Sequence, residues 1–188
     1  MKNFIKNTTL TILATFTAFI LGACKDNRSC EFNVATNSLA CPEKTYTTID
    51  IGGKTWMAEN LAVYVPDQST CYDNNHENCE TSGRLYTWQA TSNSICPIGW
   101  ELPTREDFKA AFGSIPATEL KKANVFNMQF AGFKYYDGNF ADKGSSASFW
   151  TKEPYDDSRA YMVRATETAI SYEHYNKNIF ASVRCIKQ

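Results

Sequence analysis

The stretch 96-CPIGWELPTREDFKAAFG-113 holds the clearest structural signals in the sequence. Thr104 is placed to cap a helix, and two acidic residues follow it in the first turn, where the helix dipole favours negative charge. Phe108 and Phe112 recur at helical spacing, and Gly113 is a typical stop. The stretch therefore predicts a short helix with one apolar face, bounded by Thr104 and Gly113.

Cys96, at the start of that stretch, is one of seven cysteines. If Cys24 is set apart for the reason given below, six remain, and six cysteines allow fifteen pairings. Their spacing favours two local rings and one long bridge: Cys30 with Cys41, Cys71 with Cys79, and Cys96 with Cys185. In the loop-entropy model the long bridge is worth roughly 4.5 kcal/mol. It would be the main covalent support of the fold.

The N-terminus has the features of a secretion signal. Lys2 and Lys6 precede an apolar core at residues 10–21, which is shorter than the roughly 20 residues that a permanent membrane helix needs. Leu21-Gly22-Ala23-Cys24 resembles the lipobox of bacterial lipoproteins, whose cysteine sulfur receives a diacylglycerol. This pattern predicts cleavage before Cys24 and anchoring by lipid, since two or more acyl chains hold a protein stably on a membrane. The alternative is an ordinary signal peptide that leaves Cys24 free.

Removal of residues 1–23 leaves 165 residues with 17 basic and 20 acidic side chains, a net charge of -3. That length fits one domain with a real core. No basic patch is visible, so nucleic acid is not predicted as a partner. We interpret residues 24–45 as a polar, lipid-anchored tether and residues 46–188 as the single folded domain.

Turn signals and short apolar runs fill most of the remaining chain. Gly52-Gly53 and Asp137-Gly138 are hairpin dipeptides, whereas residues 65–83 are predicted to be a polar surface excursion. A second short helix is predicted at 117–123. Strand candidates rich in aromatic and branched residues follow: "ASFWTKE", "AYMVRA", "AISYEHY" and "ASVRCIK". Helices early and antiparallel strands late predict an α+β domain.

Five blocks of the sequence resemble, in order, the Fibrobacter succinogenes major paralogous domain. They are "IGGKTWMAENL", "GRLYTWQAT", "CPIGWELPTREDF", "SFWTKE" and "SVRC", and they span roughly residues 46–187. The resemblance implies a compact α+β fold similar to C-type lectin-like and sulfatase-modifying-factor domains. It also implies that the two ends of the domain meet, with Cys96 bonded to Cys185. Members of the family are exported and often lipid-anchored. The resemblance therefore implies a fold and a cellular location more than an activity.

Neither of two candidate metal motifs is complete. Cys71, His76 and Cys79 have zinc-like spacing, but an exported chain favours a disulfide, and a fourth ligand is missing. "DNNHEN" at 73–78 resembles the first half of a calcium loop, but Asn78 stands where glycine is needed. No metal and no cofactor are therefore predicted.

Calcium-dependent lectins hold sugar through a Glu-Pro-Asn or Gln-Pro-Asp triplet and a later Trp-Asn-Asp. Here the chain has Glu153-Pro154-Tyr155 and no Trp-Asn-Asp, so sugar binding would have to use aromatic stacking and hydrogen bonds instead. The alternative interpretation is a plain turn followed by a packed strand residue. The candidate ligand-binding residues are Tyr155, Asp156, Asp157, Arg159 and Tyr161.

An enzyme is not predicted. With His76 and His174 as the only histidines, a nucleophile has few choices of base, and the cysteine arithmetic leaves no free thiol. At least three of the four tryptophans are expected to fill the core. Arg84 and Arg184 are expected to form buried or semi-buried pairs with Glu59 or Glu101.

The sequence thus predicts a lipid-anchored cell-envelope protein, at the outer membrane or cell surface, with a non-catalytic lectin-like binding or adhesion domain. Its expected partner, besides the membrane, is a polysaccharide or another envelope protein. The alternative is a structural or assembly component of an envelope complex with no small ligand.

Overall fold

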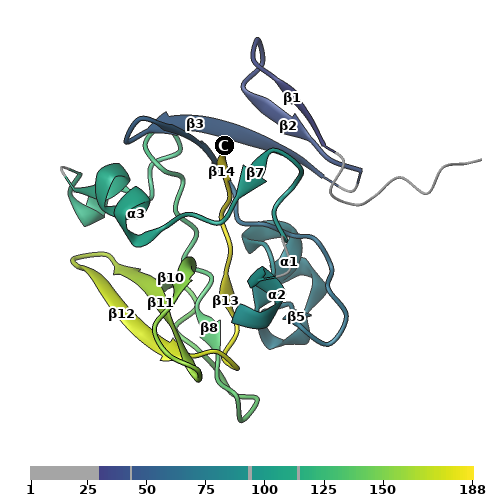
Figure 1. Ribbon diagram of the computed structural model, residues 1–188, viewed down its shortest axis with the longest axis vertical. Coiled ribbons are helices and arrows are strands. Elements are labelled where there is room, and N and C mark those ends of the chain that lie inside the picture. The colour runs from purple at the N-terminus through teal and green to yellow at the C-terminus, as the bar shows by residue number, and fades with distance from the viewer. Residues whose placement is uncertain (1–29, 43, 93–94, 114) are drawn as a thin grey trace, which may run out of the picture.

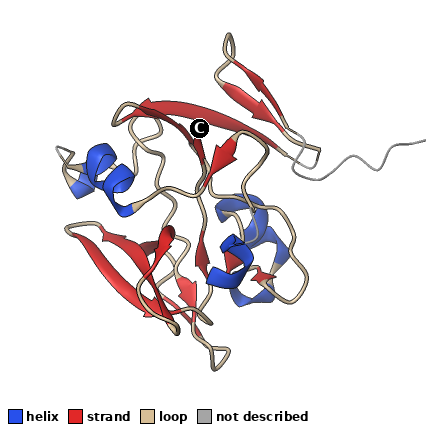
Figure 2. Cartoon of the chain, viewed as in Figure 1, coloured by secondary structure: helices blue, strands red, loops and turns tan. Residues whose placement is uncertain are grey.

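The computed structural model describes residues 30–42, 44–92, 95–113 and 115–188. In these residues the chain is mixed but rich in sheet, with few helices (Figure 2). Two six-stranded sheets and one small hairpin make up most of the regular structure.

The first sheet collects strands from both ends of the domain. The hairpin of β3 and β4 lies at its centre, with Ile51 opposite Lys54 across the Gly52-Gly53 turn, and the last strand, β14, pairs with β4. The strands, in spatial order, are β1 (Glu31–Asn33), β2 (Ser38–Ala40), β3 (Thr45–Ile51), β4 (Lys54–Met57), β14 (Ile186–Lys187) and β7 (Trp100–Glu101).

The second sheet is dominated by a three-stranded antiparallel meander, which continues through a parallel step from β10 to β13. Its strands, in spatial order, are β12 (Ile170–Asn176), β11 (Arg159–Thr166), β10 (Ser146–Pro154), β13 (Ala181–Ser182), β6 (Leu85–Tyr86) and β5 (Ser69–Thr70). A separate hairpin, β8 (Phe133–Lys134) with β9 (Phe140–Ala141), encloses Asp137-Gly138 as predicted.

Helices cover only short parts of the described chain. They are α1 (His76–Ser82), α2 (Trp88–Ser92) and α3 (Arg105–Phe112), with 3-10 turns at η1 (Tyr72–Asn74) and η2 (Ala117–Glu119). The helix predicted from Thr104 to Gly113 is confirmed as α3, with a full capping box between Thr104 and Asp107.

The second predicted helix is wrong beyond one turn. Only 117–119 is helical, as η2, because the backbone amides of Val125, Phe126 and Asn127 all donate to the carbonyl oxygen of Lys122 and reverse the chain. That reversal directs Phe126 into the core.

In contrast, α1 lies inside the stretch expected to be a polar excursion, and Asn75 caps it by accepting from the amide of Glu77.

The three predicted cysteine pairs are present: Cys30–Cys41, Cys71–Cys79 and Cys96–Cys185. The first closes the β1–β2 hairpin, and β2 pairs with β3, so the first sheet continues across the expected boundary between tether and domain. The signal peptide at 1–23 and the lipidation residue Cys24 lie outside the described residues.

Both sheets are joined by the C-terminal strand segment, which runs from β13 to β14 (yellow in Figure 1). Between these strands the backbone pairs with the segment after β4: the amide of Met57 donates to Cys185, and that of Leu61 donates to Val183. Two apolar clusters flank this seam. Trp56, Trp100 and Trp150 are buried in them as expected, whereas Trp88 is only half-buried.

Arg184 is fully buried in the middle of the seam. Its guanidinium donates to the backbone oxygens of Phe126 and Asn127 and to the side-chain amide oxygens of Asn60 and Gln129, at 2.5 to 3.2 Å. Burial lowers the pKa of Arg184 to about 9, so the side chain stays charged at neutral pH.

The carboxylate partners expected for the two arginines are wrong. Glu59 accepts from the amide and hydroxyl of Thr47, and Glu101 pairs with Lys152. Backbone and amide oxygens accept from the two terminal nitrogens of Arg184 instead, because the 126–129 segment lies against it, while its buried Nε has no hydrogen-bond partner in the structure. Arg84 donates to the carbonyl oxygen of Ala62.

Replacing Arg184 with methionine should lower the free energy of unfolding by about 3 kcal/mol, because four acceptors, two of them in fully buried hydrogen bonds, lose their charge-assisted partner. The measurement is urea unfolding under non-reducing conditions. Arg164→Met is the matched control: Arg164 is half-buried with one ion pair, to Asp142, and its loss should cost less than about 1 kcal/mol. Equal losses in the two variants would contradict the role given to Arg184.

Candidate functional site

The predicted ligand-binding residues lie at one end of the second sheet, where the turn 155–158 connects β10 to β11. Asp156 organises this turn. Its carboxylate accepts from the backbone amides of Ser158 at 2.9 Å and Arg159 at 2.7 Å, and pairs with the Arg159 guanidinium at 2.6 Å. The turn is therefore held by a local side-chain network as well as by strand pairing.

Three rings form a stack beside this turn. Tyr155 is 44% exposed and lies parallel to His174, with 3.9 Å between ring centroids. Tyr161 packs edge-on against Tyr155 at 5.2 Å. The antiparallel register sets this arrangement, because it places Tyr161 of β11 directly opposite His174 of β12.

Two guanidinium groups complete the cluster. Arg159 lies over the Tyr155 ring, 4.8 Å from its centroid, and Arg105, the first residue of α3, lies 3.7 Å from the centroid of Tyr161. Such cation–π contacts are worth roughly 0.5–2 kcal/mol. Because His174, Tyr161 and Arg159 already engage the Tyr155 ring, a ligand would reach its exposed edge and hydroxyl more readily than a free face.

Four of the five predicted residues are thus brought together: Tyr155, Asp156, Arg159 and Tyr161. Asp157 is exposed, and its carboxylate makes no hydrogen bond or ion pair within the described part of the chain. Its backbone oxygen accepts from Lys177.

The sequence did not assign His174, Arg105 or Lys177 to the site. His174 could have been found by pairing the two predicted strands around their turn, since this places it opposite Tyr161. Nothing local in the sequence places Arg105 near Tyr161, because the two belong to different elements that meet only through packing.

Two buried polar atoms in the cluster lack partners. Nδ1 of His174 and Nε of Arg105 are shielded from solvent, and neither has a hydrogen bond in the structure. Groups of this kind are normally satisfied by protein, ordered water or ligand. Both atoms lie beside Tyr161, inside the cluster and out of reach of a ligand at the surface.

A cavity of about 350 Å³ lies at Trp88 and Trp100, and it shares no lining residue with the turn 155–158. Lys177 connects the two: its ammonium group donates to the backbone oxygens of Asp156 and Asp157 and lies 4.6 Å from the centroid of Trp88. The walls combine indole rings with polar and charged groups, and include Trp88, Thr91, Trp100, Glu101, Lys152 and Gln188. Lys152 and Glu101 form an ion pair at 2.5 Å within that wall.

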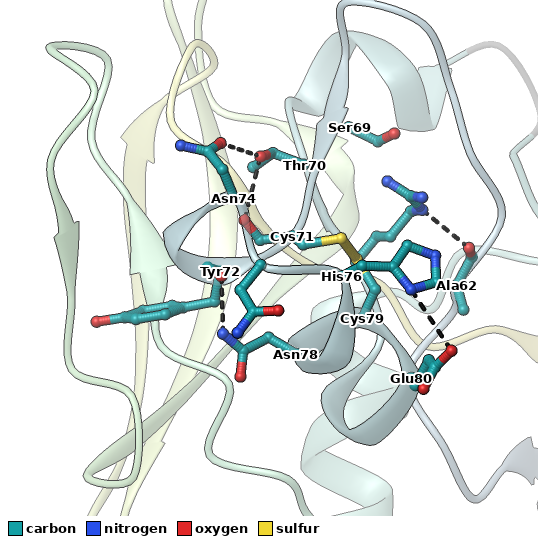
Figure 3. The surroundings of a disulfide bond; sticks show 12 residues. Ala62, Ser69, Thr70, Cys71, Tyr72, Asn74, His76, Asn78, Cys79 and Glu80 are labelled. Atoms are coloured by element: carbon teal, nitrogen blue, oxygen red, sulfur yellow. Dashed lines mark hydrogen bonds and ion pairs between the residues drawn. A yellow bond between two sulfur atoms is a disulfide. The ribbon is translucent and has the colours of Figure 1, made fainter.

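Possible metal ligands do not converge in the described segments. Cys71 and Cys79, which flank His76 in the sequence, are joined as a disulfide (Figure 3). No group of three histidine, cysteine, aspartate or glutamate side chains that could hold a metal ion occurs among residues 30–42, 44–92, 95–113 and 115–188. Over the same ranges, no helix has the length and hydropathy required to span a bilayer.

Residues 49–113 match the family model of the Fibrobacter succinogenes major domain. The match runs from β3 to the end of α3 and includes three of the five resembling blocks, so it supports this domain family for that segment. The turn 155–158 lies outside the match. No curated protein matches the chain, and no solved structure does.

The Asp156 carboxyl should titrate well below its usual value of 3.8, because the hydrogen bond from Arg159 favours the ionised form. With a lowered folded-state pKa, the interaction supports the turn at pH 4 and above and weakens only as the pH falls below that range. Carbon-detected NMR titration measures the midpoint directly. Arg159→Gln should raise the midpoint toward 3.8, whereas Arg164→Gln should not move it; no change with Arg159→Gln would refute the assignment.

Proposed function

We propose that this protein is a lipid-anchored component of the cell envelope whose single domain binds a polysaccharide chain without chemically changing it. The binding surface consists of the turn 155–158, the Tyr155–His174–Tyr161 stack and the adjoining cavity at Trp88 and Trp100. We refer to these parts together as the turn surface.

The observation that carries this proposal is a hollow with aromatic and polar walls, which Lys177 links to the turn 155–158. Small-ligand sites are concave, largely apolar and aromatic, and contain a few placed polar groups. A sugar ring presents a carbon-bound face and a rim of hydroxyls. The half-buried Trp88 supplies an aromatic wall, and Glu101, Lys152 and Gln188 supply hydrogen-bonding groups around it.

A non-catalytic role is supported by the contacts of the cysteines and of His174, the side chains best suited to catalysis. All six cysteines in the described residues are in disulfides. His174 is stacked on Tyr155, and no carboxylate is bonded to its Nδ1. A catalytic histidine base is normally oriented by such a carboxylate.

A lectin-like fold is part of this proposal. It is supported by the meeting of the domain's ends, since β14 pairs with β4 and the Cys96–Cys185 bridge joins the segment before α3 to the last strand segment. The match to this family supports the proposed envelope location, because the family resemblance implies an exported protein.

A flat assembly interface is less well supported as an alternative. The exposed large apolar residues of the described chain belong to several different loops: Val34, Tyr64, Ile98, Tyr135, Tyr136 and Tyr155. Stable association surfaces typically show a contiguous apolar area of several hundred Å².

Saturable binding to at least one neutral polysaccharide is expected when the mature protein is tested against a panel of plant and bacterial glycans. Tyr155→Ala and Trp88→Ala should each weaken that binding about tenfold, the loss of roughly 1.4 kcal/mol of contact energy. Isothermal titration calorimetry measures the affinities, and circular dichroism checks the fold of each variant.

Tyr136→Ala is the matched control, because Tyr136 is 74% exposed on the β8–β9 turn and makes no ring contact with the turn surface. Binding that is lost equally in Tyr136→Ala and Tyr155→Ala, or that is absent for every glycan, would reject the proposed site. In the second case a protein partner becomes the better explanation.

The anchor is tested separately. We expect the protein to partition into the detergent phase and to incorporate labelled palmitate, and we expect Cys24→Ser to abolish both. Retention of the label in Cys24→Ser would show that the lipid is attached elsewhere, and an unlabelled protein would favour an ordinary signal peptide.

A further inference from the structure

A second cavity, of about 250 Å³, lies away from the turn surface, between the end of the β1–β2 hairpin and α1. Cys41 and Cys79 belong to its walls, and each is held by a disulfide. Figure 3 shows the Cys71–Cys79 bridge with His76, Cys79 and Glu80 on α1 and Ala62 on the neighbouring segment. The two bridges fix the walls before any ligand arrives, which lowers the entropic cost of binding.

Arg84 is the central polar group of this cavity. Its Nε donates to the backbone oxygen of Ala62 at 3.1 Å, and its guanidinium carbon lies 5.0 Å from the ring centroid of Tyr64. These contacts hold the guanidinium plane, but neither terminal nitrogen has a hydrogen-bond acceptor within the part of the chain that the structure describes. A half-buried guanidinium with its terminal nitrogens unpaired is an unfilled bidentate donor.

Lys44 supplies a second positive charge. Its ammonium nitrogen has a single hydrogen bond within the described chain, a long one of 3.5 Å to the backbone oxygen of Glu80. It also lies 5.6 Å from the centroid of Tyr46, a buried ring in the wall. Lys44 therefore retains donors for a ligand in the cavity.

One carboxylate opposes these charges. Glu80 lies in the cavity wall, but its carboxylate is directed at Nδ1 of His76 at 3.4 Å, and both side chains are largely exposed. With His76 neutral, the lining carries a formal charge of +1 in a mature chain whose net charge is -3. A singly charged anion matches this balance better than a phosphate, which carries about -1.5 to -2 at neutral pH.

We propose that this cavity binds a small organic carboxylate, with its two oxygens on the terminal nitrogens of Arg84 and its charge shared with Lys44. The volume lies just below the range of about 300–1,000 Å³ that suits drug-sized ligands, and it fits a single acidic sugar. This site goes beyond the proposed function, because it shares no residue with the turn surface. A hexuronic acid, free or as a unit of an acidic chain, has the required chemistry.

The test is calorimetric titration of the mature protein with galacturonate, oligogalacturonate, inorganic phosphate and, as the matched neutral ring, galactose. Galacturonate should bind saturably and galactose should not. Arg84→Gln should weaken galacturonate binding at least about tenfold, since it removes a charge-assisted bidentate pair. Arg84→Lys, which keeps the charge and loses the planar fork, should also weaken it.

Lys44→Gln should weaken galacturonate binding severalfold. It also covers the case in which the Arg84 variants fail to fold, because Lys44 makes only one long hydrogen bond. Lys109→Gln is the control: Lys109 is an exposed cation on α3, paired with Glu106 and remote in sequence from the cavity, and its loss should leave the affinity unchanged.

The proposal is overturned if galacturonate does not bind, if Arg84→Gln and Lys44→Gln leave its affinity unchanged, or if phosphate binds more tightly than galacturonate. Oligogalacturonate that binds with the same Arg84 dependence identifies an acidic chain as the source, and binding of the monomer alone identifies a free acid. Failure here is distinguishable from failure of the turn surface, because Arg84→Gln should not alter binding of neutral polysaccharide, and Tyr155→Ala should not alter binding of galacturonate.

Discussion

The buried guanidinium of Arg184 is the interaction on which the arrangement of the two sheets depends. It lies between β13 of one sheet and β14 of the other, and its donors hold the 126–129 segment and Asn60 at the same point. A charge in this position is tolerated only when its donors have good acceptors, because desolvation of an ion otherwise costs several kcal/mol. The 126–129 segment must therefore adopt a conformation that turns its carbonyl oxygens toward Arg184. Folding of one region is thereby tied to folding of the other.

The turn surface depends on the same seam. Cys185, next to Arg184, is bonded to Cys96, which lines the Trp88–Trp100 cavity. Just before Arg184 in the sequence, β13 pairs with β10, and the end of β10 leads into the turn 155–158. The cavity and the turn are thus connected to the buried arginine through one short segment, which explains how a surface built from distant parts of the sequence can have defined geometry. The Asp156 network then adds local order where the strands end.

Features set by neighbouring residues could be predicted from the sequence, whereas features set by contacts between distant residues could not. The hairpin turns, α3 and three of the four late strands follow from signals within a few residues, such as the capping box at Thr104 and the glycine pair at 52–53, and these predictions are confirmed. The strand predicted at 181–187 is instead divided into β13 and β14, because residues 183–185 pass from one sheet to the other. The partners of Arg184 lie up to 124 residues away, and no local pattern distinguishes a carboxylate from a backbone oxygen at that distance. Tyr155, Asp156, Arg159 and Tyr161 could be grouped by proximity in the chain, and His174 by pairing the two predicted strands, whereas nothing local places Arg105 near Tyr161. Helix α1 was missed because its segment, HENCETS, has no apolar repeat, and a cap and a disulfide define it instead.

The two candidate sites differ in how they relate to the matched family segment. Arg84, His76, Cys79 and Glu80 lie within residues 49–113, and Cys41 and Lys44 lie shortly before that segment. In the turn surface, Trp88 and Trp100 lie within the matched segment, whereas the turn 155–158 lies outside it. A cavity held by disulfides and by a guanidinium fixed on Ala62 belongs to the rigid framework that this segment builds. The turn 155–158 is held by strand pairing and by the local Asp156 network, so its other side chains can change without disturbing the seam at Arg184. The proposed anion site would then rest on this framework, and the proposed choice of neutral chain would rest partly on the turn outside it.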